Sequence, residues 1–290
     1  MNFNICFIAI NSVNIVAYAD FIKSLHASLE DLGFKCSINT NKLLANHINI
    51  LVGATIFGSR YLNLEKELQN KPFILYQTEI LSDQYGILHE WPEYLSLIAS
   101  AQQIWDYSIH STEFLRGKGL TNLHYTSPGH HKTMEEFMPQ DKQDIDVLFY
   151  GTAQKRRLKI IDDLEKIGLK VLNLRNSSGN ERNNYIARSK VILNIHSFDN
   201  LPALETIRIS YLLANKNFVL SEISDHNPYG PGVIFENYNS LVDACQYYVR
   251  ESNSRKKVSY LGYEEIKSLD FARILSKTIE QSNIENAILN

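Results

Sequence analysis

The feature that most constrains the fold is a regular alternation of short apolar runs with longer amphipathic stretches along the whole chain. Residues 4–10 form the first run, and residues 20–32 follow with apolar side chains at helical spacing before Gly33. This alternation is typical of βα units that build a parallel sheet. The sequence therefore predicts an α/β protein.

The predicted elements fall into two groups. In the first group, further strands are expected at 35–38, 48–52, 73–77, 103–107 and 122–125, with helical segments at 61–68, 94–100 and 112–116. In the second group, strands are expected at 147–150, 170–174, 190–195, 217–221 and 233–235, with helices at 155–167, 181–189, 203–215 and 240–249. Each group has the pattern of one Rossmann-like domain.

The segment between the two groups, residues 127–142, lacks a clean period and contains two prolines and one glycine. Such a segment is typical of an interdomain linker. We therefore expect two domains, residues 1–139 and 140–290, which agrees with a chain of 290 residues at about 150 residues per domain. A terminal helix after Phe271 can pack back on the first domain.

Charge and cysteine content exclude several classes of protein. With 29 basic and 32 acidic residues the net charge is -3, so the chain is not built to coat nucleic acid or an anionic membrane, although a local basic patch is compatible with this balance. The three cysteines, Cys6, Cys36 and Cys245, form no C-x-x-C, which argues against disulfides and zinc and favours a reducing compartment. The N-terminus lacks the basic region of a signal peptide and no apolar stretch approaches about 18 residues, so we expect a cytoplasmic protein with no integral membrane segment.

A predicted strand, a glycine turn and a basic helix start follow one another at residues 150–157. Gly151 lets backbone N–H groups approach a ligand, and Lys155, Arg156 and Arg157 add charge to the positive end of the helix dipole. Cations at this end of a helix oppose the dipole, so the pattern indicates an anion site; the alternative is a solvated basic patch. The segment is neither a Walker motif nor G-x-G-x-x-G, which argues against a nucleoside triphosphatase and an NAD enzyme.

A second candidate site lies at residues 194–208. The buried strand ends in Asn194 and His196, and Glu205 and Arg208 begin the next helix three residues apart on one face. A carboxylate at this position can accept both ribose hydroxyls of a nucleotide, and Arg208 can orient it or reach a phosphate. The alternative is that Glu205 only suits the helix dipole.

Polar residues also end the predicted strands of the first domain, where an acceptor or a general base would lie. They are Glu79, Asp106 and His110, with His130 similar in kind in the following segment; each alone is compatible with a loop hydrogen-bonding role. Asp144 and Asp146 match a metal-binding D-x-D pattern, but they precede a strand instead of following one, so we expect a polar strand entry and no essential metal.

At these residues the chain resembles GT-B fold bacterial glycosyltransferases, in particular the CgeB-like and family-1-type enzymes. The matching segments are DVLFYGTAQKRR, ARSKVILNIH and LETIRISYLLANKNFVLSE, with weaker matches at YQTE, IWDYS and SPGH. The resemblance implies two Rossmann-like domains facing across a cleft. It implies that Gly151, Lys155, Arg156 and Arg157 meet the donor diphosphate, that Glu205 binds the ribose, and that Asn194, His196 and Arg208 line the donor site.

The implied function is metal-independent glycosyl transfer from a nucleotide-diphosphate sugar to an acceptor hydroxyl, with no cofactor besides this co-substrate. Glu79, His110 or His130 would act as the base if the reaction inverts configuration. The acceptor would be a glycan, a lipid-linked glycan, a protein or a modified nucleic acid, in bacterial glycan or glycoconjugate synthesis. Many such enzymes carry two glutamates with seven residues between them, and Ser197 takes the place of the first. This departure keeps open the alternative of a non-catalytic nucleotide-sugar-binding partner subunit. A sugar-nucleotide epimerase on the same fold is a further alternative.

Overall fold

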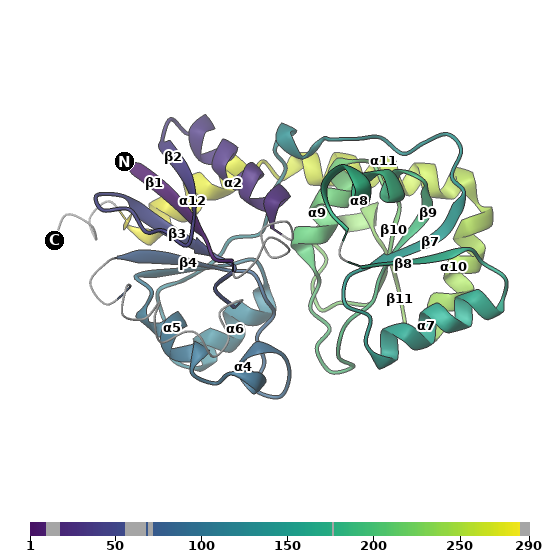
Figure 1. Ribbon diagram of the computed structural model, residues 1–290, viewed down its shortest axis with the longest axis horizontal. Coiled ribbons are helices and arrows are strands. Elements are labelled where there is room, and N and C mark those ends of the chain that lie inside the picture. Colours follow the sequence, from purple (N-terminus) through teal and green to yellow (C-terminus); the bar gives the residue numbers. More distant parts are fainter. Residues whose placement is uncertain (10–17, 56–67, 69–71, 176, 285–290) are drawn as a thin grey trace. The chain divides into compact units, whose positions relative to one another are not determined.

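The computed structural model describes residues 1–9, 18–55, 68, 72–175 and 177–284 (Figure 1). The chain divides into two compact units, the first made of Met1–Thr133 and Asp270–Asn290 and the second of Met134–Leu269. The division falls inside the segment 127–142 that the sequence predicts as a linker. The predicted helix at 61–68 lies almost entirely outside the described residues.

The first unit contains a six-stranded sheet in which every neighbouring pair is parallel. Its strands are β1 (Asn2–Phe7), β2 (Lys35–Thr40), β3 (Ile48–Val52), β4 (Phe73–Gln77), β5 (Gln103–Asp106) and β6 (Leu123–Tyr125). Its helices are α2 (Ala19–Asp31), α4 (Ile87–Glu90), α5 (Tyr94–Ser100), α6 (Ile109–Gly117) and α12 (Phe271–Ser282). The strand order β2-β1-β3-β4-β5-β6 reverses direction between β1 and β3, as in a doubly wound fold.

Helices cover both faces of this first sheet. On one face the ring of Phe21 in α2 lies 4.8 Å from that of Tyr76 and 6.1 Å from that of Phe271 in α12. On the other face Ile104 packs with the buried side chains of α5 and α6. Since successive strand residues point to opposite faces, apolar runs buried on both sides are the expected signature of such a sheet.

The second unit repeats this architecture with five parallel strands in the order β11-β10-β9-β7-β8. Its strands are β7 (Ile145–Tyr150), β8 (Val171–Leu174), β9 (Ser189–Asn194), β10 (Val219–Glu222) and β11 (Ile234–Glu236). Its helices are α7 (Lys155–Lys166), α8 (Gly179–Ala187), α9 (Thr206–Ala214), α10 (Leu241–Arg250) and α11 (Ser252–Ser268). The predicted α/β fold class with two Rossmann-like domains is confirmed.

The core of the second unit is divided between the two faces of its sheet. Val147 and Phe149 pack with α7 and α10, whereas Leu148 packs with α8, α9 and α11. The helices that follow β7 and β9 therefore leave the sheet on opposite faces. Between these two adjacent strands the direction of winding reverses, which is where open α/β sheets bind ligands.

Helix α11 is absent from the predictions, and its packing explains why. Its interior carries polar residues and Gly262, which weaken the helical pattern, yet this glycine is required by a close contact. A Cβ on Gly262 would lie 2.7 Å from Cδ2 of Leu213 in α9 and 2.8 Å from the carbonyl oxygen of Gly232. Among the helices that the structure describes, none is long and apolar enough to cross a membrane.

Gly262→Ala is expected to destabilise the protein by about 1–3 kcal/mol, because the added methyl group overpacks a contact whose neighbour on one side is backbone. Urea unfolding followed by circular dichroism measures this loss. The matched control is Gly117→Ala at the end of α6, where an added Cβ meets nothing within 4 Å and a gain of up to about 1 kcal/mol is expected. Equal stability of the Gly262→Ala variant and the wild type would contradict the packing argument.

Candidate functional site

The candidate site lies at the carboxyl ends of β7 and β9 in the second unit. Gly151 directly follows β7 and has a φ of 129°, a conformation that favours glycine. A Cβ on Gly151 would lie only 3.1 Å from Nη2 of Arg208, so the turn and this guanidinium approach each other closely. Arg208 also lies over the ring of Tyr150, 5.1 Å from its centroid, and donates to Oδ1 of Asn194 at 3.3 Å.

Arg157 is the second cation of the site and is almost completely buried, with 5% of its surface exposed. Its guanidinium donates to the carbonyl oxygens of Ile195 (2.9 Å) and Thr152 (2.7 Å). Burial, followed by the positive charge of Arg208, lowers the pKa of Arg157 to about 10. Within the described part of the chain, neither Arg157 nor Arg208 forms an ion pair with a carboxylate, so two cations face the Gly151 turn without a bonded anion.

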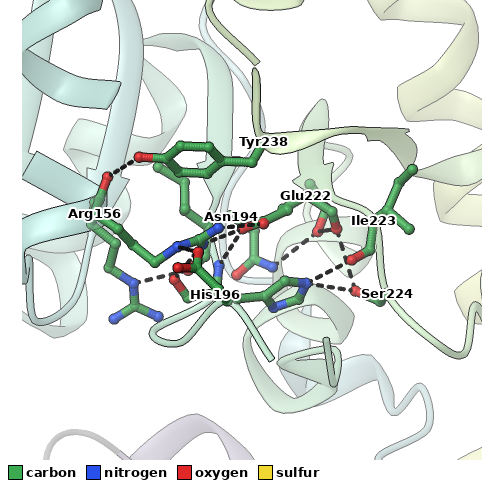
Figure 2. Close-up of polar contacts among 11 residues, drawn as sticks. Arg156, Asn194, His196, Glu222, Ile223, Ser224 and Tyr238 are labelled. Atoms are coloured by element: carbon green, nitrogen blue, oxygen red, sulfur yellow. Dashed lines mark hydrogen bonds and ion pairs between the residues drawn. The ribbon is translucent and has the colours of Figure 1, made fainter. Parts of the chain in front are cut away.

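Arg156 has a different environment, shown in Figure 2. Its Nη1 and Nη2 donate to the two carboxylate oxygens of Glu222 at 2.6 and 2.7 Å, and its Nε donates to Oδ1 of Asp199 at 2.5 Å. Nη1 also donates to the carbonyl oxygen of His196 at 3.0 Å. The guanidinium stacks on Tyr238, 4.1 Å from the ring centroid, and the Tyr238 hydroxyl donates to the carbonyl oxygen of Arg156. This arginine is thus already paired with carboxylates.

Asn194 and His196 are buried and tie the ends of β9 and β10 together. The Asn194 amide donates to Oγ of Ser221 at 3.0 Å. The Nε2 atom of His196 lies 2.8 Å from the carbonyl oxygen of Ile223 and 3.3 Å from Oγ of Ser224 (Figure 2). Because its exposed fraction is only 4%, His196 contributes to this site mainly through the backbone that it fixes.

Glu205 and Lys155 occupy the starts of the two helices that leave the site. Glu205 is half-buried at the N-cap of α9, where its side chain makes no capping hydrogen bond, and its negative charge acts on Arg157. Lys155 is the first residue of α7 and is exposed. The structure therefore gathers Gly151, Arg156, Arg157, Asn194, His196 and Arg208 in one set of contacts or close approaches, with Glu205 within electrostatic range.

Glu222 and Tyr238 belong to the same site but are missing from the residues predicted for it. Glu222 ends β10 and is 8% exposed, and besides Arg156 it accepts from the backbone N–H of His196 at 3.0 Å. The rule that ligand sites form at the carboxyl ends of parallel strands points to Glu222, since this residue directly follows the predicted strand 217–221. No sequence signal points to Tyr238, because its contact with Arg156 depends on packing between distant segments.

The three predicted base candidates come after three neighbouring strands of the first sheet, β4, β5 and β6. Glu79 follows β4 and accepts from the Tyr18 hydroxyl at 2.8 Å. His110 is the second residue of α6, not part of a loop, because Ser108 caps that helix by accepting from the Ser111 N–H. His130 follows β6, and its carbonyl oxygen accepts from the N–H of Phe271 at 3.0 Å. Their catalytic roles remain predictions.

Asp106, at the end of β5, is completely buried. Its Oδ1 accepts from the Ser108 N–H at 2.8 Å, whereas Oδ2 has no hydrogen-bond partner among the residues that the structure describes. Burial raises the pKa of Asp106 well above its ordinary value, although the Ser108 N–H acts in the opposite direction. The folded protein thus favours the neutral acid at this position.

Asp106→Asn is expected to stabilise the protein at pH 8 by about 1–3 kcal/mol, because the amide avoids the cost of protonating or burying a carboxylate on folding and keeps an acceptor for the Ser108 N–H. A group whose pKa rises on folding contributes stability below its unfolded pKa of about 3.9 and loses it as the pH rises through the folded pKa. The variant should therefore match the wild type near pH 4 and exceed it at higher pH. Thermal unfolding between pH 4 and 8 tests this; lower stability of the variant at every pH would contradict it.

The D-x-D aspartates lie at the amino end of β7, away from the site at its carboxyl end. Asp144 forms a two-pronged ion pair with Arg188 at 2.6 and 2.8 Å, which lowers the pKa of Asp144 to about 2. Asp146 bonds Lys190 at 2.6 Å and accepts from the Lys170 N–H at 2.9 Å. Both carboxylates behave as a polar strand entry. The predicted independence from metal stays a prediction.

The sequence relatives of this chain are uncharacterized viral proteins. No protein-family model matches the sequence. Over 191 residues the chain is 28% identical to uncharacterized protein L140 of Acanthamoeba polyphaga mimivirus, covering 64% of this chain and 59% of that protein. Uncharacterized protein L137 of the same virus is 26% identical over 233 residues, covering 79% of this chain and 30% of that protein. The chain thus spans less than two thirds of the length of either relative.

Three solved structures match nearly the whole chain. Sucrose-phosphate synthase from Thermosynechococcus elongatus has a TM-score of 0.63 at 10% identity, with 99% of both chains covered. Anabaena HepE in complex with UDP-glucose has a TM-score of 0.63 at 10% identity, covering 96% of this chain and 98% of that one. T4 phage BGT in complex with UDP and Mn2+ has a TM-score of 0.62 at 12% identity, covering 95% and 99%.

These likenesses establish the class of fold: the chain has the GT-B fold of nucleotide-sugar glycosyltransferases. The more specific resemblance to CgeB-like enzymes stays a prediction, because no family model matches. The bacterial setting also stays a prediction, since L140 and L137 are mimivirus proteins.

Proposed function

We propose that this protein is a glycosyltransferase whose second unit binds the nucleoside diphosphate part of a nucleotide-sugar donor. The observation that carries the proposal is the pair of cations, Arg157 and Arg208, beside the Gly151 turn at the point where the sheet reverses direction. Arg157 is buried against carbonyl oxygens, with no carboxylate bonded to it among the described residues. Burying a charge without a counter-ion is costly, so this arrangement favours an anionic ligand. Diphosphate is an anion that fits two guanidinium groups and the N-terminus of α7.

The same groups suit the chemistry of glycosyl transfer. When the bond between the sugar and the diphosphate breaks, negative charge grows on the leaving phosphate. Arg157, Arg208 and the N-terminus of α7 would stabilise that charge where it develops. Glu205, at the start of α9, would accept hydroxyl groups of the ribose.

Metal-independent transfer is part of the proposal, because the cations named above would supply the charge that a divalent metal supplies elsewhere. One structural neighbour, T4 phage BGT, is described in complex with UDP and Mn2+, so the metal requirement needs a direct test. Donor turnover with and without EDTA makes that test, and loss of turnover on chelation would contradict this part of the proposal.

The first unit would present the acceptor hydroxyl, with Glu79, His110 or His130 as the base in an inverting reaction. The acceptor would belong to one of the classes that the sequence suggests: a glycan, a lipid-linked glycan, a protein or a modified nucleic acid. One neighbour of similar fold is described as a DNA-modifying β-glucosyltransferase, with a TM-score of 0.62 at 11% identity. This description supports keeping modified nucleic acid among the acceptors to be tested.

A thermal-shift screen tests the donor site directly. UDP, GDP, ADP, CMP and their sugar conjugates are added separately, and one nucleoside diphosphate should raise the Tm by several degrees, since ligand at 100 times its Kd stabilises by about 2.7 kcal/mol. Slow hydrolysis of the corresponding sugar nucleotide without acceptor should follow. Absence of any shift at millimolar concentration would contradict the proposed function.

Ser197 favours a second candidate, a non-catalytic partner subunit, because it replaces the first of the two glutamates that many such enzymes carry. That protein would bind the nucleotide but would not hydrolyse the donor. An epimerase would instead convert the donor sugar with no acceptor present. Product analysis in the same hydrolysis assay separates these outcomes.

A further inference from the structure

Arg156 and Glu222 form the most extensively bonded ion pair of the candidate site. The resemblance to known transferases implies that Arg156 meets the donor diphosphate, but its contacts favour a different role. We propose that Glu222 is a positioning residue: it holds Arg156 away from the phosphates, and the pair fixes the loop that connects β9 to α9. This inference rests on the proposed donor site and assigns the phosphate contacts within it to Arg157 and Arg208.

The hydrogen-bonding capacity of Arg156 is almost fully used. Its guanidinium makes four donor contacts, two to Glu222, one to Asp199 and one to the carbonyl oxygen of His196. The side chains of Arg156 and Glu222 are only 14% and 10% exposed. Tyr238 covers one face of the guanidinium (Figure 2). A phosphate would have to displace an existing carboxylate to reach this arginine.

The three arginines of the site also differ in whether a carboxylate neutralises them. Arg156 is neutralised by Glu222 and Asp199, whereas Arg157 and Arg208 have no carboxylate ion pair within the described residues. A two-pronged arginine–carboxylate pair with this little exposure is held by both charge and geometry. The anion of a ligand is therefore expected to meet the half-buried Arg208 and the Nη2 atom of Arg157, since Nε and Nη1 of Arg157 already donate to carbonyl oxygens.

Both partners of the Arg156–Glu222 ion pair form a hydrogen bond with the backbone of His196. Glu222 accepts from its N–H at 3.0 Å, and Arg156 donates to its carbonyl oxygen, also at 3.0 Å. Arg156 holds the same loop again at Asp199, and the loop then leads to Glu205 at the start of α9. Breaking the pair should loosen the loop that positions Glu205 while leaving Gly151, Arg157 and Arg208 in place.

Two probes separate positioning from phosphate contact. Inorganic pyrophosphate reports on the phosphate contacts alone, whereas UDP, GDP and ADP, titrated separately, also report on the ribose contacts of Glu205. Calorimetry is carried out on the full chain with the wild type and with Arg156→Ala, Glu222→Gln and Arg208→Ala. Arg156→Lys serves as a second variant, because it keeps the charge but cannot make the four contacts.

Arg208→Ala should weaken pyrophosphate and the bound nucleotide alike, by at least about tenfold. Arg156→Ala, Arg156→Lys and Glu222→Gln should weaken the nucleotide by about tenfold and change pyrophosphate affinity by less than about threefold. Adding Glu222→Gln to Arg156→Ala should produce no further loss, because the two residues act through one contact. Circular dichroism confirms that each variant is folded.

Failure of the proposed function and failure of the positioning roles would give different results. Wild-type protein that binds none of the three nucleotides contradicts the proposed function itself. Wild-type binding together with a loss of pyrophosphate affinity in Arg156→Ala equal to that in Arg208→Ala overturns only the positioning roles of Arg156 and Glu222. Retention of pyrophosphate binding in Arg156→Lys but not in Arg156→Ala would do the same, because it would show that the charge itself contacts the phosphates.

Discussion

Arg208→Glu is expected to lower the affinity for nucleoside diphosphates by more than about a hundredfold. In the wild type, Nη2 of Arg208 lies beside the Gly151 turn, and the pKa of Arg157 is lowered first by burial and then by the positive charge of Arg208. A glutamate would replace attraction for the diphosphate with repulsion. It could also pair with Arg157 and neutralise the second cation of the site. Isothermal titration with UDP, or with the nucleotide that gives a thermal shift, measures the loss.

Lys159→Glu is the matched control for this charge reversal. Lys159 lies on the exposed side of α7, is 67% exposed and pairs with Asp163. The same change in net charge at this position should alter nucleotide affinity by less than about threefold. If Arg208→Glu binds the nucleotide as tightly as Lys159→Glu does, Arg208 is not a phosphate contact.

Gly151→Val is expected to abolish detectable nucleotide binding, a loss of more than about a hundredfold, and to cost about 1–3 kcal/mol of stability. The φ of 129° is a conformation that a β-branched residue rarely adopts, and its Cβ would lie 3.1 Å from Nη2 of Arg208. The variant would therefore distort the turn and displace the arginine together. Calorimetry and urea unfolding measure the two effects separately.

Gly168→Val separates backbone strain from the loss of the site. Gly168 follows α7, has a φ of 85°, and an added Cβ there meets nothing within 4 Å. Gly168→Val should lose stability to a similar extent yet keep nucleotide affinity within about threefold of the wild type. Unchanged nucleotide binding in Gly151→Val would show that the turn does not contact the ligand.

The general architecture could be predicted because βα units leave a strong pattern in the sequence. Strand positions depend on local apolar runs, so β3 and β4 fall at the predicted residues. The carboxyl ends of the predicted strands 147–150 and 190–195 then point to Gly151, Asn194 and His196 as candidate site residues. What local pattern cannot give is a helix such as α11, whose glycine is explained only by its contact with Gly232.

The roles of the two adjacent arginines illustrate what else the sequence could not predict. In the sequence, Arg156 and Arg157 are adjacent and equivalent members of one basic cluster. Successive residues on a helix point about 100° apart, so their side chains reach different partners: two carboxylates for Arg156 and two backbone carbonyls for Arg157. Glu222 comes 66 positions after Arg156. Their pairing depends on the lateral order of β9, β10 and β7, which no local pattern specifies.

The first unit consists of two segments of the chain, with the whole second unit inserted between them. All the residues of the proposed donor site lie in one continuous segment, Met134–Leu269, whereas α12 belongs to the first unit. Next to these two boundaries, His130 and Asp270 form a parallel bridge, and the His130 carbonyl oxygen accepts from Phe271. The second unit is therefore a continuous insertion whose two ends lie next to each other, and a short peptide joining residues 133 and 270 would replace it. Under the proposed function, exchanging the second unit at these two junctions for that of another protein of the same fold would transfer the donor specificity and leave the first unit unchanged.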